Sequence, residues 1–82
     1  MSPRKVWARI ESGNLDLRFD DLLGLAYAFG FQLARTRGSH HILVHSELPV
    51  MLNLQLAGGR AKRYQVRQLL AAVRDNGLKL SP

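Results

Sequence analysis

Residues 31–55 read FQLARTRGSHHILVHSELPVMLNLQ, and this stretch decides the fold. Short runs with alternating apolar side chains are separated by residues typical of turns, which predicts strands joined by tight connections. Consecutive strands with such short connections pair in antiparallel order. We expect strands at Phe31–Thr36, Ser39–His45 and Val50–Gln55, with turns at Arg37-Gly38 and Ser46–Pro49.

Helical periodicity flanks these strands on both sides. Serine and proline favour a helix start, and glycine favours a helix end. The expected helices begin at Ser2-Pro3, at Phe19, and at Arg60 or Ala61, and they end at Gly13, Gly30 and Gly77. The order ααβββα predicts an α+β two-layer sandwich, in which helices cover one face of a three-stranded antiparallel sheet.

The composition narrows the class of protein. The chain has 82 residues, which suits one small domain. Cysteine is absent, so neither a disulfide framework nor a thiolate metal site is expected. The start of the chain lacks the apolar core of a signal peptide, and no apolar run approaches the roughly 20 residues that span a bilayer. We therefore expect a soluble, cytoplasmic protein with no membrane partner.

The charge is strongly basic. Lysine and arginine number 12 against 6 acidic residues, a formal net charge of +6. Between Arg35 and Arg67 lie six basic residues and one acid, Glu47, so this stretch carries +5 of that total. Such clustering favours a nucleic acid or another polyanion as partner. The alternative is a solvated basic surface with no partner.

The strands carry three histidines, and alternation separates them. His40 shares a side with Ile42 and Val44, whereas His41 and His45 point the other way. We expect the β-branched pair to face the core, which places His40 at the sheltered end of the helix-covered face. Histidine can take and give a proton near neutral pH. The alternative is three ordinary strand residues, since no carboxylate is close in sequence to orient them and they are too few to predict a metal site.

Cations also gather where the last helix is expected to begin. Positive side chains at the N-terminal end oppose the helix dipole, but the free N–H groups at a helix start attract anions. This pattern predicts a phosphate site, and a solvated basic turn is the alternative. The residues concerned are Arg60, Lys62, Arg63 and Arg67, with Tyr64 among them.

The motif Gly38-Ser39-His40-His41-Ile42 resembles the glycine–serine–histidine strand of the HicA family, the RNA-cleaving toxins of bacterial toxin–antitoxin pairs. The resemblance covers residues 18–78, in a branch of the family with a longer N-terminus. We therefore expect one HicA-like toxin domain over residues 1–82, with an extra helix at 1–13. The other segments similar to the family are Phe19–Leu22, Gly30-Phe31, Asn53–Gln55, Ala61-Lys62 and Tyr64–Gln68.

The resemblance implies a fold like that of a double-stranded-RNA-binding domain. It also implies cleavage of mRNA without the ribosome and neutralisation by a HicB-type antitoxin. By motif position, His40 matches the catalytic histidine of the family, and His41 is the second choice.

We therefore expect an endoribonuclease that uses histidine acid–base catalysis without a metal or any other cofactor. His40 would act as general base on the ribose 2′-OH or as general acid on the leaving 5′-oxygen. Two alternatives stay open: a non-catalytic RNA-binding module, and a basic interaction domain for an acidic protein partner. The residues expected to bind RNA or phosphate are Arg35, Arg37, Ser39, Arg60, Lys62, Arg63, Tyr64 and Arg67.

Overall fold

The structure, a computed structural model, describes residues 1–80 and has the element order ααβββα. The predicted α+β class and the antiparallel sheet are confirmed. The helices are α1 (Pro3–Glu11), α2 (Phe19–Ala28) and α3 (Arg63–Asn76), and the strands are β1 (Phe31–Arg37), β2 (His40–His45) and β3 (Met51–Gln55).

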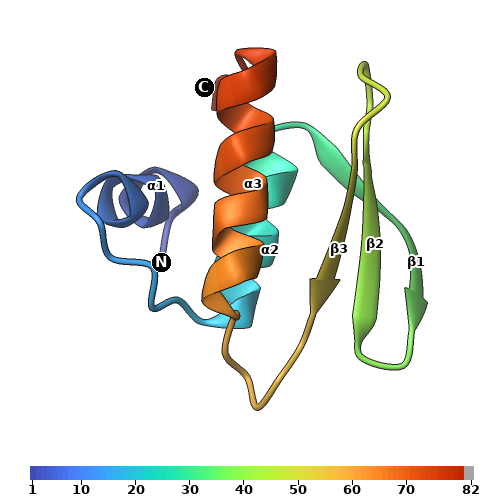
Figure 1. The fold of residues 1–82 in the computed structure, drawn as a ribbon, viewed down its shortest axis with the longest axis horizontal. Coiled ribbons are helices and arrows are strands. Elements are labelled where there is room, and N and C mark those ends of the chain that lie inside the picture. The colour runs from blue at the N-terminus through green and yellow to red at the C-terminus, as the bar shows by residue number, and fades with distance from the viewer. Residues whose placement is uncertain (81–82) are drawn as a thin grey trace.

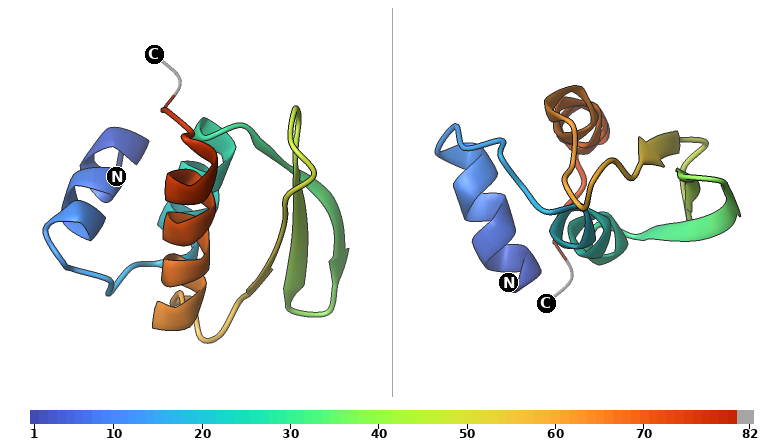
Figure 2. Two further views of the ribbon diagram at one scale, coloured as in Figure 1. Left: turned by 45° about the horizontal axis from the view of Figure 1, so that its top comes forward. Right: turned by 90° about the horizontal axis from the view of Figure 1, so that it is seen from below.

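The sheet has the strand order β1-β2-β3, with both pairs antiparallel. α2 packs against β1 and α3 against β3, so the two helices cover one face of the sheet (Figure 1). α1 packs on α2 and lies beyond this helical layer, away from the sheet (Figure 2). The second face, here named the open face, consists by strand register of Gln32, Arg35, Arg37, His40, Ile42, Val44, Met51, Asn53 and Gln55.

Local signals and one aromatic contact explain α1. The Ser2 hydroxyl caps the helix by accepting a hydrogen bond from the Lys5 N–H at 3.3 Å. Trp7 meets Phe29 edge-on, with ring centroids 4.9 Å apart. A helix this short depends on such tertiary contacts, so α1 forms by completing the core on the outer side of α2.

The predicted start of α3 is wrong, because the helix begins at Arg63 and not at Arg60 or Ala61. The Ala61 side chain is buried in the core, and its N–H donates to the Leu17 carbonyl at 3.0 Å. Arg60 forms isolated bridges with Arg18 and Ala57. The non-local pairings with Leu17 and Arg18 hold the segment extended, and the helix starts only after Lys62.

The predicted sidedness of β2 is also wrong. Leu43 is fully buried beneath the helices, whereas Val44 is 38% exposed. The cause is the neighbouring strand: Leu43 pairs with Leu52, which is buried in the core. Directly paired residues share a face, so β3 decides the orientation of β2 and outweighs the β-branched preference. His40 therefore lies on the open face, and His41 and His45 lie on the helix-covered face.

A β-bulge in β1 changes which side chains reach the open face. The register shifts between Leu33 and Arg35, so that Leu33 pairs with Leu43 while Arg35 pairs with Ile42. Regular alternation would have placed Arg35 on the helix-covered side, because the side-chain period of a strand is two. The extra residue at Ala34 thus moves Arg35 onto the open face, and Arg37 with it.

α3 is tied to the end of β3 by one polar side chain. Gln65 is fully buried, with 0% of its surface exposed. In the amide orientation that satisfies both groups, its nitrogen donates to the Gln55 carbonyl at 3.1 Å and its oxygen accepts from the Gln55 N–H at 2.7 Å. These bonds satisfy backbone groups that the edge strand would otherwise leave unpaired.

Candidate active site and nucleic-acid interface

His40 is the exposed histidine of the open face, and a neighbouring strand holds its ring. Its Nδ1 lies 3.1 Å from Asn53 Oδ1. An amide oxygen can only accept, so this contact assigns the proton to Nδ1 and leaves the Nε2 lone pair free. A neutral, oriented imidazole with a free nitrogen is the form required of a general base.

Sequence reasoning missed Asn53 as a site residue. Alternation in β3 places its side chain on the opposite face from the buried Leu52 and Leu54. The wrong side assigned to His40 hid the pairing. The signal that finds it is the register of β2 against β3, in which Asn53 is directly opposite Ile42, two residues from His40.

Two arginines of β1 flank His40 on the same face. Arg37 is directly opposite His40 in the ladder, and Arg35 is opposite Ile42. Both side chains are exposed. The open-face residues therefore combine two guanidinium groups with one imidazole and include no carboxylate. A guanidinium binds phosphate oxygens through paired hydrogen bonds, so a polyanion is the complementary ligand.

Ser39 sits in the turn between β1 and β2, and its hydroxyl is held by the end of β3. The Gln55 amide nitrogen donates to Ser39 Oγ at 3.3 Å. This bond connects the turn before His40 to Gln55, whose backbone is bound by Gln65 of α3. Ser39 thus contributes to the shape of the turn.

His41 lies on the opposite side of the sheet from His40. It is half-buried, its Nδ1 donates to the Ser39 carbonyl at 3.1 Å, and its ring is tilted against Phe19 at 4.8 Å between centroids. The structure therefore does not bring the two neighbouring histidines together at one site.

His45 is occupied by structural contacts. Its Nε2 donates to the Phe29 carbonyl at 3.0 Å, and its Nδ1 accepts from the Glu47 N–H at 3.1 Å. The ring also meets Phe31 edge-on at 5.1 Å between centroids. Both ring nitrogens are engaged, so His45 connects the end of β2 to the end of α2.

The cations around the start of α3 form a separate group on the other side of the sheet from His40. Lys62, Arg63 and Arg67 are exposed, and Lys62 Nζ lies 6.0 Å from the Tyr64 ring centroid. Figure 1 shows the first turn of α3 at the same end of the molecule as the turn between β1 and β2. Strand β3 separates this group from the open face.

Arg60 has a carboxylate partner in the loop before α2. Its Nη2 donates to Asp16 Oδ1. This hydrogen bond, followed by the charge of Arg60, holds the pKa of the Asp16 carboxyl below its usual value. Among the predicted phosphate-binding residues, Arg60 is therefore already engaged within the protein.

Comparison of the chain with protein-family models, with curated proteins and with solved structures found no match. Within residues 1–80, no helix combines the length and the apolar character needed to cross a bilayer. In the same residues, no three histidine, cysteine or acidic side chains lie together as candidate metal ligands.

Proposed function

We propose that this chain is an endoribonuclease that cuts RNA with His40, in the manner expected of a HicA-type toxin. One observation carries the proposal: an exposed imidazole is held at Nδ1 by Asn53 on a face that also presents Arg35 and Arg37. The arrangement combines a proton acceptor with two phosphate-binding groups, which is what cleavage beside a captured phosphate requires.

The proposed reaction starts with proton transfer to His40 Nε2 from the ribose 2′-OH. The 2′-oxygen forms a bond to the adjacent phosphorus, and the bond from phosphorus to the 5′-oxygen breaks. The products are a fragment ending in a 2′,3′-cyclic phosphate and a fragment with a free 5′-OH. Asn53 stabilises the imidazolium that forms, because its amide oxygen keeps accepting from Nδ1–H.

Arg35 and Arg37 would stabilise the charge that gathers on the phosphate oxygens in the transition state. Of the open-face residues, only His40 has a side chain suited to both accepting and donating the proton in this step. The leaving 5′-oxygen must therefore take its proton from water or from an imidazolium formed earlier. This incomplete acid–base pair is consistent with slow turnover.

The resemblance to HicA toxins further leads us to propose control by a HicB-type antitoxin. An antitoxin that blocks cleavage must cover His40 or the arginines beside it. Because the open face carries guanidinium groups and no carboxylate, the complementary surface of such a partner is acidic.

The experiment compares His40→Gln with His41→Gln, two neighbours on opposite faces of β2. Purified protein is incubated with RNA, and the fragments are resolved on a denaturing gel. We expect His40→Gln to lose at least about a hundredfold in rate, while His41→Gln keeps most of the activity once its fold is verified by thermal unfolding. The reverse pattern would remove His40 from the mechanism, and binding without cleavage by wild type would leave only an RNA-binding module.

A further inference from the structure

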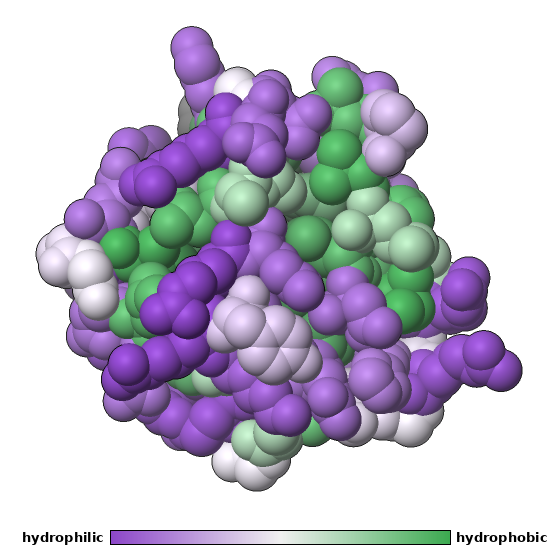
Figure 3. Space-filling view, in the orientation of Figure 1, coloured by the Kyte–Doolittle hydropathy of each residue, from purple (hydrophilic) through white to green (hydrophobic). Residues whose placement is uncertain are grey.

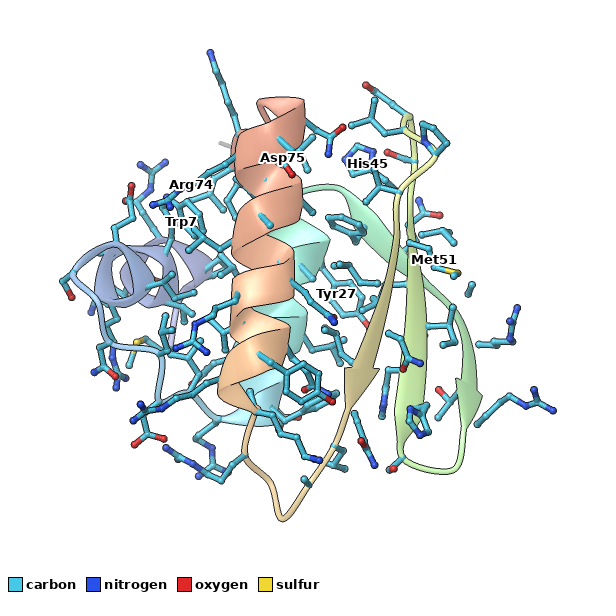
Figure 4. The ribbon with its side chains drawn as sticks, viewed as in Figure 1. Trp7, Tyr27, His45, Met51, Arg74 and Asp75 are labelled. Atoms are coloured by element: carbon cyan, nitrogen blue, oxygen red, sulfur yellow. The ribbon has the colours of Figure 1, made fainter. Side chains whose placement is uncertain are left out.

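The open face has a second half whose character differs from the site around His40. Away from the turn between β1 and β2, Val44 and Met51 form a directly paired, exposed apolar platform, 38% and 64% exposed. Figure 3 shows hydrophobic surface on the sheet side of the molecule, and Figure 4 shows Met51 there, pointing away from the helices. An exposed apolar pair on a face otherwise rich in polar groups favours a binding function.

We propose that the open face binds single-stranded RNA, with an unstacked base of a flanking nucleotide lying on the platform of Val44 and Met51. The inference rests on the proposed function, because it names the form of RNA that the His40 site accepts. Charge complementarity supports RNA as the occupant, since Arg35 and Arg37 border the same face without an opposing carboxylate.

The position of the platform sets which nucleotide it contacts. Val44 is four residues along β2 from His40, which corresponds to about 13 Å at the rise of an extended strand. The base on the platform is therefore not that of the cleaved nucleotide. The exposed Asn53 and its directly paired neighbour Ile42, which is 8% exposed, lie between the two ends of this path.

Two arguments favour a single strand over a duplex. The bases of A-form RNA are stacked inside the helix, so a duplex offers phosphates and 2′-hydroxyls but no base face for the platform. The proposed cleavage also requires the 2′-oxygen to stand in line with the bond to the leaving 5′-oxygen. Stacked A-form geometry prevents that alignment, whereas an unpaired strand can reach it.

The test measures binding by the uncut complex, so that it does not depend on catalysis. His40→Ala protein is titrated into a fluorescent single-stranded oligoribonucleotide and into the duplex of the same sequence. Val44→Thr and Met51→Thr are then added together; the first keeps the β-branched shape of valine, and the second replaces an unbranched side chain by one that strands favour. We expect the single strand to bind at least fivefold more tightly than the duplex, and the double substitution to weaken only the single strand, by about threefold to tenfold.

The control is Leu33→Thr, a strand residue whose exposure (43%) lies between those of Val44 and Met51, and which pairs with Leu43 and so belongs to the helix-covered side. We expect it to leave both affinities unchanged. Equal loss for the single strand and the duplex, or no loss at all, would overturn the platform and leave this half of the face to a protein partner. If the wild type cuts RNA while the platform variants bind normally, the inference fails and the proposed function stands. If the platform variants bind the single strand more weakly but the wild type cuts no RNA, the inference stands and the proposed function fails.

Discussion

The hydrogen bond between His40 on β2 and Asn53 on β3 determines which ring nitrogen of His40 carries the proton. Without it, the exposed ring would rotate and exchange its two tautomers freely. The bond selects one orientation, in which Nε2 is the free base. Asn53 therefore positions the His40 ring, and in the proposed reaction we expect it to affect the catalytic step more than RNA binding.

Asn53→Ala tests this role. We expect kcat for RNA cleavage to fall about tenfold or more, because only part of the population keeps the productive ring orientation. KM should change little, since the phosphate-binding arginines are untouched. Asn53→Gln is the comparison, because it keeps the amide but moves it by one methylene. A fall in KM and kcat together, or no change in either, would contradict a positioning role.

Replacing Gly30 and Gly24 by alanine should change the stability of the fold in opposite directions. Gly30 has φ +99°, and a Cβ there would lie 2.8 Å from His45 Nε2, whereas a Cβ at Gly24 meets nothing within 4 Å. Gly30→Ala should destabilise the fold by about 1–3 kcal/mol, through strain and displacement of the His45 ring. Gly24→Ala should stabilise α2 by up to about 1 kcal/mol. Thermal unfolding of both variants checks this, and equal shifts would contradict the contact at Gly30.

The start of α3 and the end of β3 form one unit because Gln65 bonds to both backbone groups of Gln55. The same Gln55 donates to Ser39 and pairs with His40 in the ladder. The packing of α3 therefore reaches the turn that precedes His40 through a short chain of contacts.

Gln65→Met measures the strength of this connection. Methionine matches the size of glutamine but leaves the Gln55 N–H and carbonyl without partners, so we expect a loss of about 1–3 kcal/mol in the free energy of unfolding. The control is Gln68→Met on the exposed side of α3, which should change stability by less than about 0.5 kcal/mol. Equal effects in urea unfolding would show that the Gln65 bonds contribute nothing.

The loops before α2 and α3 are joined by the pair of Asp16 and Arg60. The hydrogen bond from Arg60 and its charge lower the pKa of the Asp16 carboxyl below its ordinary value in the folded state. A carboxyl of this kind stabilises the fold above its unfolded pKa, and the contribution is lost as pH falls through the lower folded pKa. Asp16→Asn should therefore lower the Tm slightly at pH 7, and this difference should shrink below about pH 4.

Arg60→Gln should reproduce the effect, and the double variant should add nothing, because both remove the same pair. Thermal unfolding at pH 7 and pH 3 gives the comparison. A Tm difference that is constant with pH would mean that the pair does not contribute through the charge of Asp16.

Sequence patterns predicted the elements well because helix caps, glycine ends and strand alternation are local signals. In β3 alternation also marks the buried side, since Leu52 and Leu54 are buried and the residues that alternate with them include Asn53 and Gln55. In β2 both sides carry apolar residues, so alternation alone did not show whether Ile42 or Leu43 faces the helices. The pairing with β3 settled the orientation, and pairing is not a property of one strand.

The candidate site depended on two further non-local features. The bulge at Ala34 has no glycine or proline to mark it, yet it determines the side on which Arg35 and Arg37 lie. The extended path of Ala61 depends on a bond to Leu17, which is 44 residues away in the chain. The sequence could therefore name His40 and the arginines but could not group them or supply Asn53.

At the scale of the whole molecule, the net charge of +6 is divided between the two sides of the sheet. One group, Arg35 and Arg37, lies on the open face beside His40, and the other surrounds the start of α3. If both contact the same RNA, the strand must pass the end of β3. If only the open face binds RNA, the α3 group takes no part in substrate binding.

Cleavage chemistry tests the central proposal most directly. Wild-type protein is incubated with a single-stranded oligoribonucleotide, and the fragments are weighed by mass spectrometry. We predict 5′-side fragments that end in a 2′,3′-cyclic phosphate, 3′-side fragments with a free 5′-OH, and no cut where the nucleotide lacks its 2′-OH. Fragments ending in 3′-OH with a 5′-phosphate partner, or intact RNA throughout, would contradict a role for His40 as base on the ribose.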